Sequence, residues 1–173
     1  MSLHDIEYVL TKLSWMREQR IWPNGLRYLW TDAFGLVLLV SLYRDLHEER
    51  YLDDAEVLVR DVDRVLGRRR GIRIGEAPDR DGQYFHYLAM WLYALSSLSE
   101  HIPQYRARAI ALARHVHRPF VLPEKGVVWK MKEDLSGRIL VLVMAHWTHL
   151  TDTWCIASLE SKRLRLKSWK CRS

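Results

Sequence analysis

Residues 29–118 contain two copies of one unit, in which a segment apolar on all sides precedes a segment apolar on one face only. The first copy covers residues 29–66 and the second covers residues 84–118. Their second segments superimpose at a spacing of 54 residues, which aligns Tyr51 with Tyr105, Ala55 with Ala109, Leu58 with Leu112, Val62 with Val116, and Arg64 with Arg118. A repeated helical hairpin must stack on its neighbour, because a single hairpin cannot bury its own apolar surface.

Apolar residues at spacings of three and four predict an amphipathic helix over residues 3–18. A second helix is expected to open near Thr31 and Asp32, which are good capping residues, and to end near Leu46. We expect an outer helix over 52–66, an inner helix over 84–98 and an outer helix over 105–117. The inner helices have no polar side and should be covered on every side. Alternating inner and outer helices indicate an all-α fold with concentric layers, an α/α toroid, because a plain bundle has amphipathic helices throughout.

After the repeats, Pro119 and Pro123 should end helix formation. Residues 126–131 are expected to form an extended segment or a short hairpin strand, and residues 138–144 should begin another apolar helix. We therefore assign residues 1–144 to one domain.

Residues 145–173 form an atypical basic tail that does not continue the repeat. This tail has six Lys or Arg and two Asp or Glu, so it accounts for +4 of the net charge of +6. We interpret the tail as the product of a shifted reading frame, a truncation or a mispredicted exon. Its His146, His149, Asp152 and Cys155 imitate a zinc site, but their spacing fits no structural zinc motif, and we expect no metal.

The remaining 144 residues have a net charge of only +2, and their basic residues alternate with acidic ones. Nucleic-acid binding needs clustered Lys and Arg, so we expect no nucleic-acid partner. The longest apolar run, residues 33–43, is shorter than the roughly 20 residues that cross a bilayer, and we expect no membrane partner. Residues 1–20 lack the pattern of a secretory signal, which makes the cytoplasm the expected location.

Two segments, Tyr28-Leu29-Trp30-Thr31-Asp32-Ala33-Phe34-Gly35 and Gly82-Gln83-Tyr84-Phe85-His86-Tyr87-Leu88, each open an inner helix. Together with the hairpin pattern they resemble the six-hairpin (α/α)6 toroid superfamily, which includes six-hairpin glycosidases, unsaturated uronyl hydrolases and N-acylglucosamine 2-epimerase-like enzymes. The similarity covers roughly residues 26–144, about two and a half hairpins of six, so the chain corresponds to a truncated, partial toroid. The resemblance implies a carbohydrate-active protein that acts on or binds a sugar or uronide in a central cavity, or an inactive form of such a protein if truncation has removed the activity.

In such a toroid the N-terminal ends of the inner helices line the cavity, and this places the candidate residues. Glycoside hydrolysis takes two carboxylates, and epimerisation takes a base such as His. The catalytic candidates are Asp32, His86 and Glu133. Residues that suit sugar binding are aromatic rings for the apolar sugar face and polar side chains for the hydroxyls: Arg27, Trp30, Gln83, Tyr84, Trp129, Lys130 and Asp134. We expect no cofactor.

Structural interpretations compete with these roles. Asp32 can be a helix N-cap, His86 a hydrogen-bonded core histidine, and Trp30 and Trp129 core residues. Glu133 and Asp134 can cap the helix expected after them. The cations at 68–70 suit the C-terminal end of the preceding helix. At the level of the whole chain, the alternatives are a non-catalytic helical-repeat interaction protein and a non-functional fragment that exposes apolar helix faces.

Overall fold

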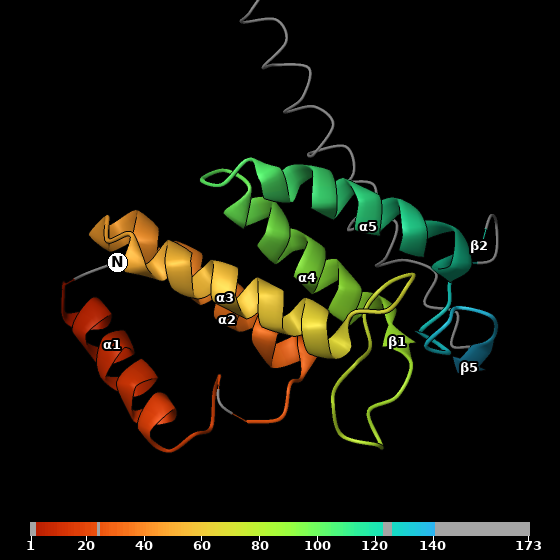
Figure 1. Ribbon diagram of the computed structural model, residues 1–173, viewed down its shortest axis with the longest axis horizontal. Helices are drawn as coiled ribbons and strands as arrows, with labels where there is room; N and C mark the ends of the chain where they lie inside the picture. The colour runs from red at the N-terminus through yellow and green to blue at the C-terminus, as the bar shows by residue number, and fades with distance from the viewer. Residues whose placement is uncertain (1–2, 24, 123–125, 141–173) are drawn as a thin grey trace, which may run out of the picture.

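The computed structural model describes residues 3–23, 25–122 and 126–140 (Figure 1). Within these residues the fold is mostly helical, with a small amount of antiparallel sheet. The helices are α1 (Leu3–Glu18), α2 (Leu29–Leu46), α3 (Arg50–Leu66), α4 (Phe85–Leu98) and α5 (Gln104–Phe120). None of the described helices is long and apolar enough to cross a membrane.

The five helices lie where the sequence predicts them, and the boundaries differ by a few residues. The boundary difference that matters for the candidate site is at the start of α2. This helix begins at Leu29, because Tyr28 has an extended backbone and occupies the N-cap position. Asp32 therefore lies inside the first turn of α2 and not at its N-cap position. The N-cap interpretation of Asp32 is wrong.

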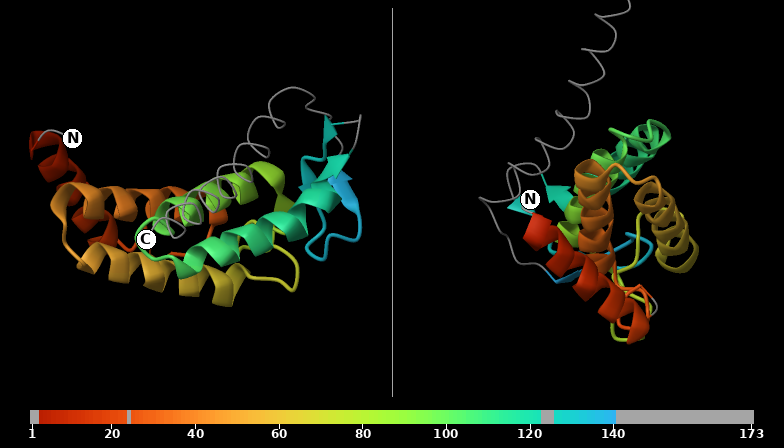
Figure 2. Two further views of the ribbon diagram at one scale, coloured as in Figure 1. Left: turned by 90° about the horizontal axis from the view of Figure 1, so that it is seen from above. Right: turned by 90° about the vertical axis from the view of Figure 1, so that its left-hand side faces the viewer.

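The two hairpins stack as the repeat predicts. Helix α2 packs on both α3 and α4, and α4 packs on α5. Helices α2 and α4 thus form one layer, and α3 and α5 form a second layer beside it (Figure 2). Two equivalent pairs of the repeat are equally buried, since Ala55 and Ala109 are both 0% exposed and Val62 and Val116 are 0% and 1% exposed.

The inner helices are not covered on every side by described residues, contrary to the sequence prediction. Phe34 on α2 is 48% exposed and Tyr93 on α4 is 42% exposed. Helix α1 lies to one side of the hairpins (Figure 1). It is tied to α3 by an ion pair of 2.6 Å between Arg17 and Asp54. Among the described residues, these two aromatic side chains of the inner helices are therefore left open to solvent.

Short strands lie at the end of the molecule where α2 and α4 begin. They are β1 (Gln83–Tyr84), β2 (Val121–Leu122), β3 (Gly126–Val127), β4 (Lys130–Met131) and β5 (Arg138–Leu140). One antiparallel sheet has the order β1-β4-β5, and β2 pairs with β3 in another. The extended segment predicted at 126–131 is confirmed.

The prediction of a helix over residues 138–144 is wrong for residues 138–140, which the structure describes. Arg138 pairs with Met131 and Leu140 with Lys130, so these residues form β5. The turn between the strands is closed by Lys132 N–H, which donates to the Gly137 carbonyl at 2.8 Å. An available partner strand therefore overrides the local apolar pattern. Residues 141–144, the boundary predicted at 144 and the basic tail lie outside the described residues.

Backbone hydrogen bonds hold the starts of α2 and α4 to the segment between the repeats and to the sheet. Leu29 N–H donates to the Ile74 carbonyl at 2.9 Å, and Ile74 N–H donates to the Gly82 carbonyl at 2.9 Å. Phe85 N–H donates to the Trp129 carbonyl at 3.1 Å. These bonds bring the first turns of both inner helices together with the residues that precede β4.

Candidate functional site

Six rings gather where α2, α4 and the segment before β4 meet, and we call them the aromatic cluster. Its members are Tyr28, Trp30, Tyr84, His86, Tyr87 and Trp129. His86 lies at the centre, stacked on Trp129 with a centroid distance of 4.3 Å and on Tyr84 at 5.4 Å. Trp30 contacts His86 at 5.5 Å and Tyr87 at 5.0 Å. Four residues predicted for the site are therefore brought together.

The local sequence explains why these rings converge. Trp30 is the second residue of α2, and Tyr84 and His86 flank Phe85, the first residue of α4. Phe85 is 3% exposed and packs on Phe120 in the core, with their ring centroids 5.6 Å apart. Since Phe85 N–H is bonded to the Trp129 carbonyl, the Trp129 ring is held close to the start of α4.

The aromatic cluster is only partly covered. Five of the six side chains are half-buried, and Tyr87 is buried. The Nδ1 atom of His86 is buried and has no hydrogen-bond partner among the described residues. Burial lowers the pKa of His86, which favours the neutral imidazole at neutral pH. The core-histidine alternative does not fit, because a core histidine is expected to be hydrogen-bonded.

Cations border the aromatic cluster on two sides. Lys130 Nζ lies 5.4 Å from the Tyr84 ring centroid and forms an ion pair of 2.9 Å with Asp81. This pairing lowers the pKa of Asp81. On the other side the Arg80 guanidinium lies 4.1 Å from the centroid of Tyr28. Such cations attract the electron-rich ring faces and add positive charge to the edge of the site.

Arg27 and Asp32 form a separate, buried ion pair. Asp32 is 0% exposed and Arg27 is 6% exposed, with Arg27 Nη1 3.4 Å from Asp32 Oδ1. The Trp22 indole N–H donates to the same carboxylate oxygen at 2.8 Å. Burial raises the pKa of Asp32, although Arg27 and Trp22 act in the opposite direction. This carboxylate joins α2 to the segment before it and has no ring of the aromatic cluster as a hydrogen-bond partner.

Gln83 is fully buried and holds two loops together. Its Oε1 accepts a hydrogen bond from Ile72 N–H at 3.0 Å. Its Nε2 donates to the carbonyls of Arg70 at 2.8 Å and Glu133 at 2.6 Å. Both amide hydrogens are therefore used inside the protein. A Cβ on Gly71 would lie 1.9 Å from Gln83 Oε1, so the loop can approach this closely only with glycine.

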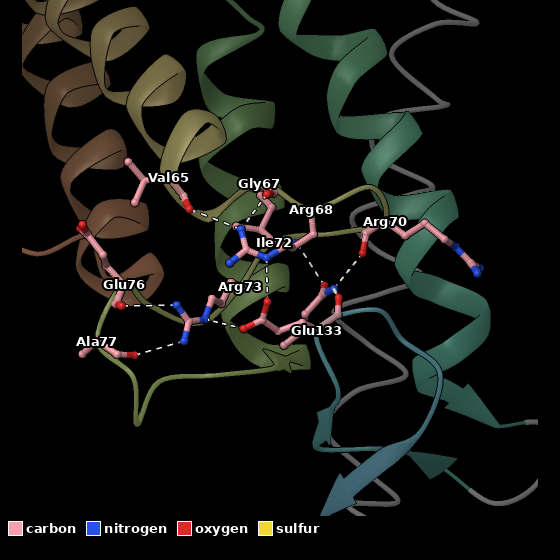
Figure 3. Close-up of polar contacts among 10 residues, drawn as sticks. Val65, Gly67, Arg68, Arg70, Ile72, Arg73, Glu76, Ala77 and Glu133 are labelled. Carbon is pink, nitrogen blue, oxygen red and sulfur yellow. Dashed lines mark hydrogen bonds and ion pairs between the residues drawn. The ribbon is translucent and has the colours of Figure 1, made fainter.

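Glu133 lies between two arginines. Its carboxylate is 2.8 Å from Arg68 Nε and 2.6 Å from Arg73 Nε (Figure 3). Arg68 Nη1 also donates to the Gly67 carbonyl at 2.9 Å, just beyond the C-terminal end of α3. The helix-end interpretation of this cation is confirmed. No helix follows Glu133 within the described residues, so its capping interpretation is wrong, and Asp134 instead accepts a turn hydrogen bond from Ser136 N–H at 2.9 Å.

The ten predicted site residues thus fall into three groups. Trp30, Tyr84, His86 and Trp129, together with Lys130 at the edge, belong to the aromatic cluster. Arg27 and Asp32 form the buried pair, and Gln83 and Glu133 form the loop network, with exposed Asp134 beside it. The sequence did not predict Tyr28 and Tyr87 as site residues, although they lie in the two segments that open the inner helices. Nothing in the sequence pattern indicated that Arg80 would lie at the edge of the site. Among the described residues no group of three or more His, Cys, Asp or Glu is placed to hold a metal ion.

A comparison with models of known protein families found no match to this chain, and neither did comparisons with curated proteins or with solved structures.

Proposed function

We propose that this chain is a carbohydrate-binding protein of the six-hairpin glycosidase-like kind, with the sugar or uronide bound against the aromatic cluster. The convergence of Trp30, Tyr84, His86 and Trp129 at the starts of both inner helices is the observation that supports this proposal. The C–H faces of a pyranose are apolar and pack well on the flat, half-buried rings of Trp and Tyr. A partial toroid built from these hairpins would place the bound sugar on its inner side.

The polar groups at the edge of the cluster favour an acidic sugar. Lys130 is largely buried along its side chain, at 14% exposure, and its ammonium group pairs with Asp81, which is 57% exposed. A uronate carboxylate can take the place of this exposed partner. The neutral imidazole of His86 offers a hydrogen-bonding nitrogen to a sugar hydroxyl.

Turnover has less support than binding. The two-carboxylate mechanism of glycoside hydrolysis needs one carboxylic acid and one carboxylate facing the glycosidic bond. Asp32 is buried with Arg27, and Glu133 is paired with two arginines. His86 is the remaining group suited to proton transfer, as in an epimerase-like reaction. We therefore assign recognition to the cluster and leave His86 as its one proposed acid–base group.

The test is a titration of the chain with glucose and, separately, with glucuronate, in which isothermal calorimetry measures the heat of binding. We expect saturable binding that is tighter for glucuronate, and a loss of about tenfold in affinity in Trp129→Ala, because a ring stacked on the ligand is removed. Trp15→Ala is the matched control, since Trp15 is 50% exposed on α1 and lies outside the cluster. Equal losses in both variants, or no saturable binding by the wild type, would reject the proposal.

A second candidate is a non-catalytic helical-repeat interaction protein. The exposed aromatic side chains of Phe34 and Tyr93 on the inner helices favour it, because exposed apolar groups are typical of protein interfaces. The same titration separates the two candidates, since an interaction protein gives no saturable heat with either sugar. Tyr93→Ser would leave sugar affinity unchanged if the first proposal is right, whereas Phe34 is unsuitable for this test because its ring contacts Trp30 of the aromatic cluster.

A further inference from the structure

A pocket of 560 Å³ lies between the two outer helices, α3 and α5. Helix α3 contributes Asp63 to it, α5 contributes Arg108 and Leu112, and α4 contributes Trp91 and Leu95. The turn that follows α3, residues 67–72, closes one end. Side chains connect the outer helices across this space, because Arg108 forms an ion pair with Asp63.

The pocket has an excess of positive charge. Its titratable lining residues are Asp63, Arg68, Arg69, Arg108 and His115. Arg69 and His115 are exposed, and neither has a side-chain partner among the described residues. The ion pairs with Asp63 and Glu133 balance Arg108 and Arg68, so the charge of Arg69 is left without compensation. The Arg108 side chain is 38% exposed, and its partial burial lowers the pKa of the guanidinium.

Trp91 adds a hydrogen-bond donor to the pocket lining. Its side chain is 0% exposed, and its indole N–H has no acceptor among the described residues. Buried donors in proteins are nearly always paired, and this unpaired donor belongs to a residue that lines a basic pocket. An oxygen atom of a bound anion is an acceptor of the required kind.

A second hollow, of 570 Å³, continues on the other side of the same turn and shares Arg68 and Arg69 with the first. Glu133 is in its lining but is already paired with Arg68. Arg70 extends its guanidinium away from Glu133 (Figure 3). The turn therefore presents two arginines, Arg69 and Arg70, to a ligand that enters from solvent.

We propose that the pocket between α3 and α5 binds the phosphoryl group of a small molecule, either inorganic phosphate or a sugar phosphate, with Arg69, Arg108 and the Trp91 indole N–H as donors. Guanidinium groups match phosphate oxygens in paired, charge-assisted hydrogen bonds, which an uncharged sugar cannot form. The pocket is wide enough for a phosphate with one hexose attached, as its volume is within the range of small-molecule sites. The proposal does not depend on sugar binding at the aromatic cluster.

The experiment is isothermal calorimetry on the full chain at constant ionic strength, with inorganic phosphate, glucose 6-phosphate, glucose and glucuronate as separate probes and chloride as the reference anion. We expect saturable binding of both phosphorylated probes. Arg69→Gln should weaken it about tenfold, because one charged donor pair is lost. Arg118→Gln is the matched control: it removes an exposed arginine of α5 that lies outside the pocket, and the affinity should stay within about twofold of wild type.

The same calorimetric data distinguish inorganic phosphate from a sugar phosphate as the ligand. Tighter binding of glucose 6-phosphate than of phosphate identifies the sugar phosphate as the ligand, and equal affinities identify phosphate itself. Arg108→Gln is a second variant, but it also breaks the ion pair with Asp63, so its thermal melting must be compared with that of wild type first.

Three results would overturn the proposal. One is the absence of saturable phosphate binding above chloride. Another is an unchanged affinity in Arg69→Gln, and the third is an equal loss in Arg69→Gln and Arg118→Gln, which indicates only diffuse surface charge. Glucuronate binding that Arg69→Gln leaves unchanged belongs to the aromatic cluster, so failure of one site is not mistaken for failure of the other.

Discussion

Asp32 shows how one buried carboxylate can organise the start of an inner helix. It accepts the Trp22 indole N–H at 2.8 Å and faces Arg27 at 3.4 Å, while all three residues are at most 8% exposed. A buried ion pair adds little net stability, but removing one partner leaves the other charge buried without compensation. The entry of the chain into α2 therefore depends on this carboxylate.

We predict that Asp32→Ala destabilises the protein by about 3–5 kcal/mol, because Arg27 is left as an unpaired buried cation and Trp22 loses its acceptor. Urea denaturation followed by circular dichroism measures the change. Asp79→Ala is the control, since Asp79 is exposed in the segment between the repeats and should change stability by less than about 0.5 kcal/mol. A variant as stable as the control would contradict the assigned role of Asp32.

His86 gives a prediction about pH. Burial lowers its pKa in the folded protein, so the unfolded chain binds the proton more readily. The contribution of His86 to stability is therefore complete above the ordinary histidine pKa of about 6.5 and is lost as the pH falls below it.

We expect His86→Phe to lose less stability than wild type between pH 7.5 and pH 5, as measured by urea denaturation at both values. The phenyl ring preserves the stacking on Trp129 and has no proton to bind. Trp15→Phe serves as control because Trp15 is exposed on α1 and carries no titratable group, and this variant should keep the wild-type pH dependence. Identical pH dependence in His86→Phe and wild type would show that burial does not perturb His86.

At the scale of the element, α2 depends on a glycine in its middle. A Cβ at Gly35 would lie 1.9 Å from Trp22 Cζ2, so the indole ring occupies the space that any other residue needs. Helix propensity alone favours alanine over glycine by about 1 kcal/mol. The close approach of Trp22 to the helix backbone opposes this preference, and it is also what brings the indole N–H to Asp32.

We predict that Gly35→Ala is destabilising by about 1–3 kcal/mol, because overpacking against Trp22 exceeds the gain in propensity. The midpoint of thermal unfolding is the readout. Gly137→Ala is the matched control, since the nearest atom to an added Cβ there is Lys132 Cε at 3.6 Å. A more stable Gly35→Ala protein would mean that Trp22 does not pack on α2 in this way.

At the scale of the whole molecule, the repeat makes two hairpins of the same design but places them in different surroundings. Leu58 on α3 is 3% exposed, whereas its equivalent Leu112 on α5 is half-buried at the pocket between the outer helices. Val62 and Val116 are instead equally buried. Identical residues at equivalent positions thus differ in energetic importance where the tertiary surroundings differ.

We expect Leu58→Ala to cost about 2–5 kcal/mol and Leu112→Ala to cost less than half as much, because the cost of truncation rises with the apolar surface that the side chain buries. Paired urea denaturation curves give the comparison. Val62→Ala and Val116→Ala are the internal control and should lose similar amounts. Equal losses at Leu58 and Leu112 would contradict the difference in burial.

The sequence alone determined the helices and their order, because burial imposes a 3.6-residue period on the outer helices and a continuous apolar character on the inner ones. The same argument agrees with the burial of Leu88, Trp91 and Leu95 on α4, all 0% exposed. The resemblance to six-hairpin toroids predicted the aromatic half of the candidate site, because it implies that the first turns of the inner helices, which contain or directly follow Trp30, Tyr84 and His86, lie around one cavity.

Only the tertiary structure decided which polar residues pair with one another. Glu133 meets Arg68 across 65 residues of sequence, and Gln83 meets the Glu133 carbonyl across 50 residues. No periodicity relates such distant positions, so the sequence offered catalysis or capping for Glu133 and sugar binding for Gln83, where the fold uses these side chains to join loops. The pairing of β5 with β4 overrode a local helical pattern for the same reason. Local preferences set the elements, and long-range hydrogen bonds and ion pairs set the partners of their polar side chains.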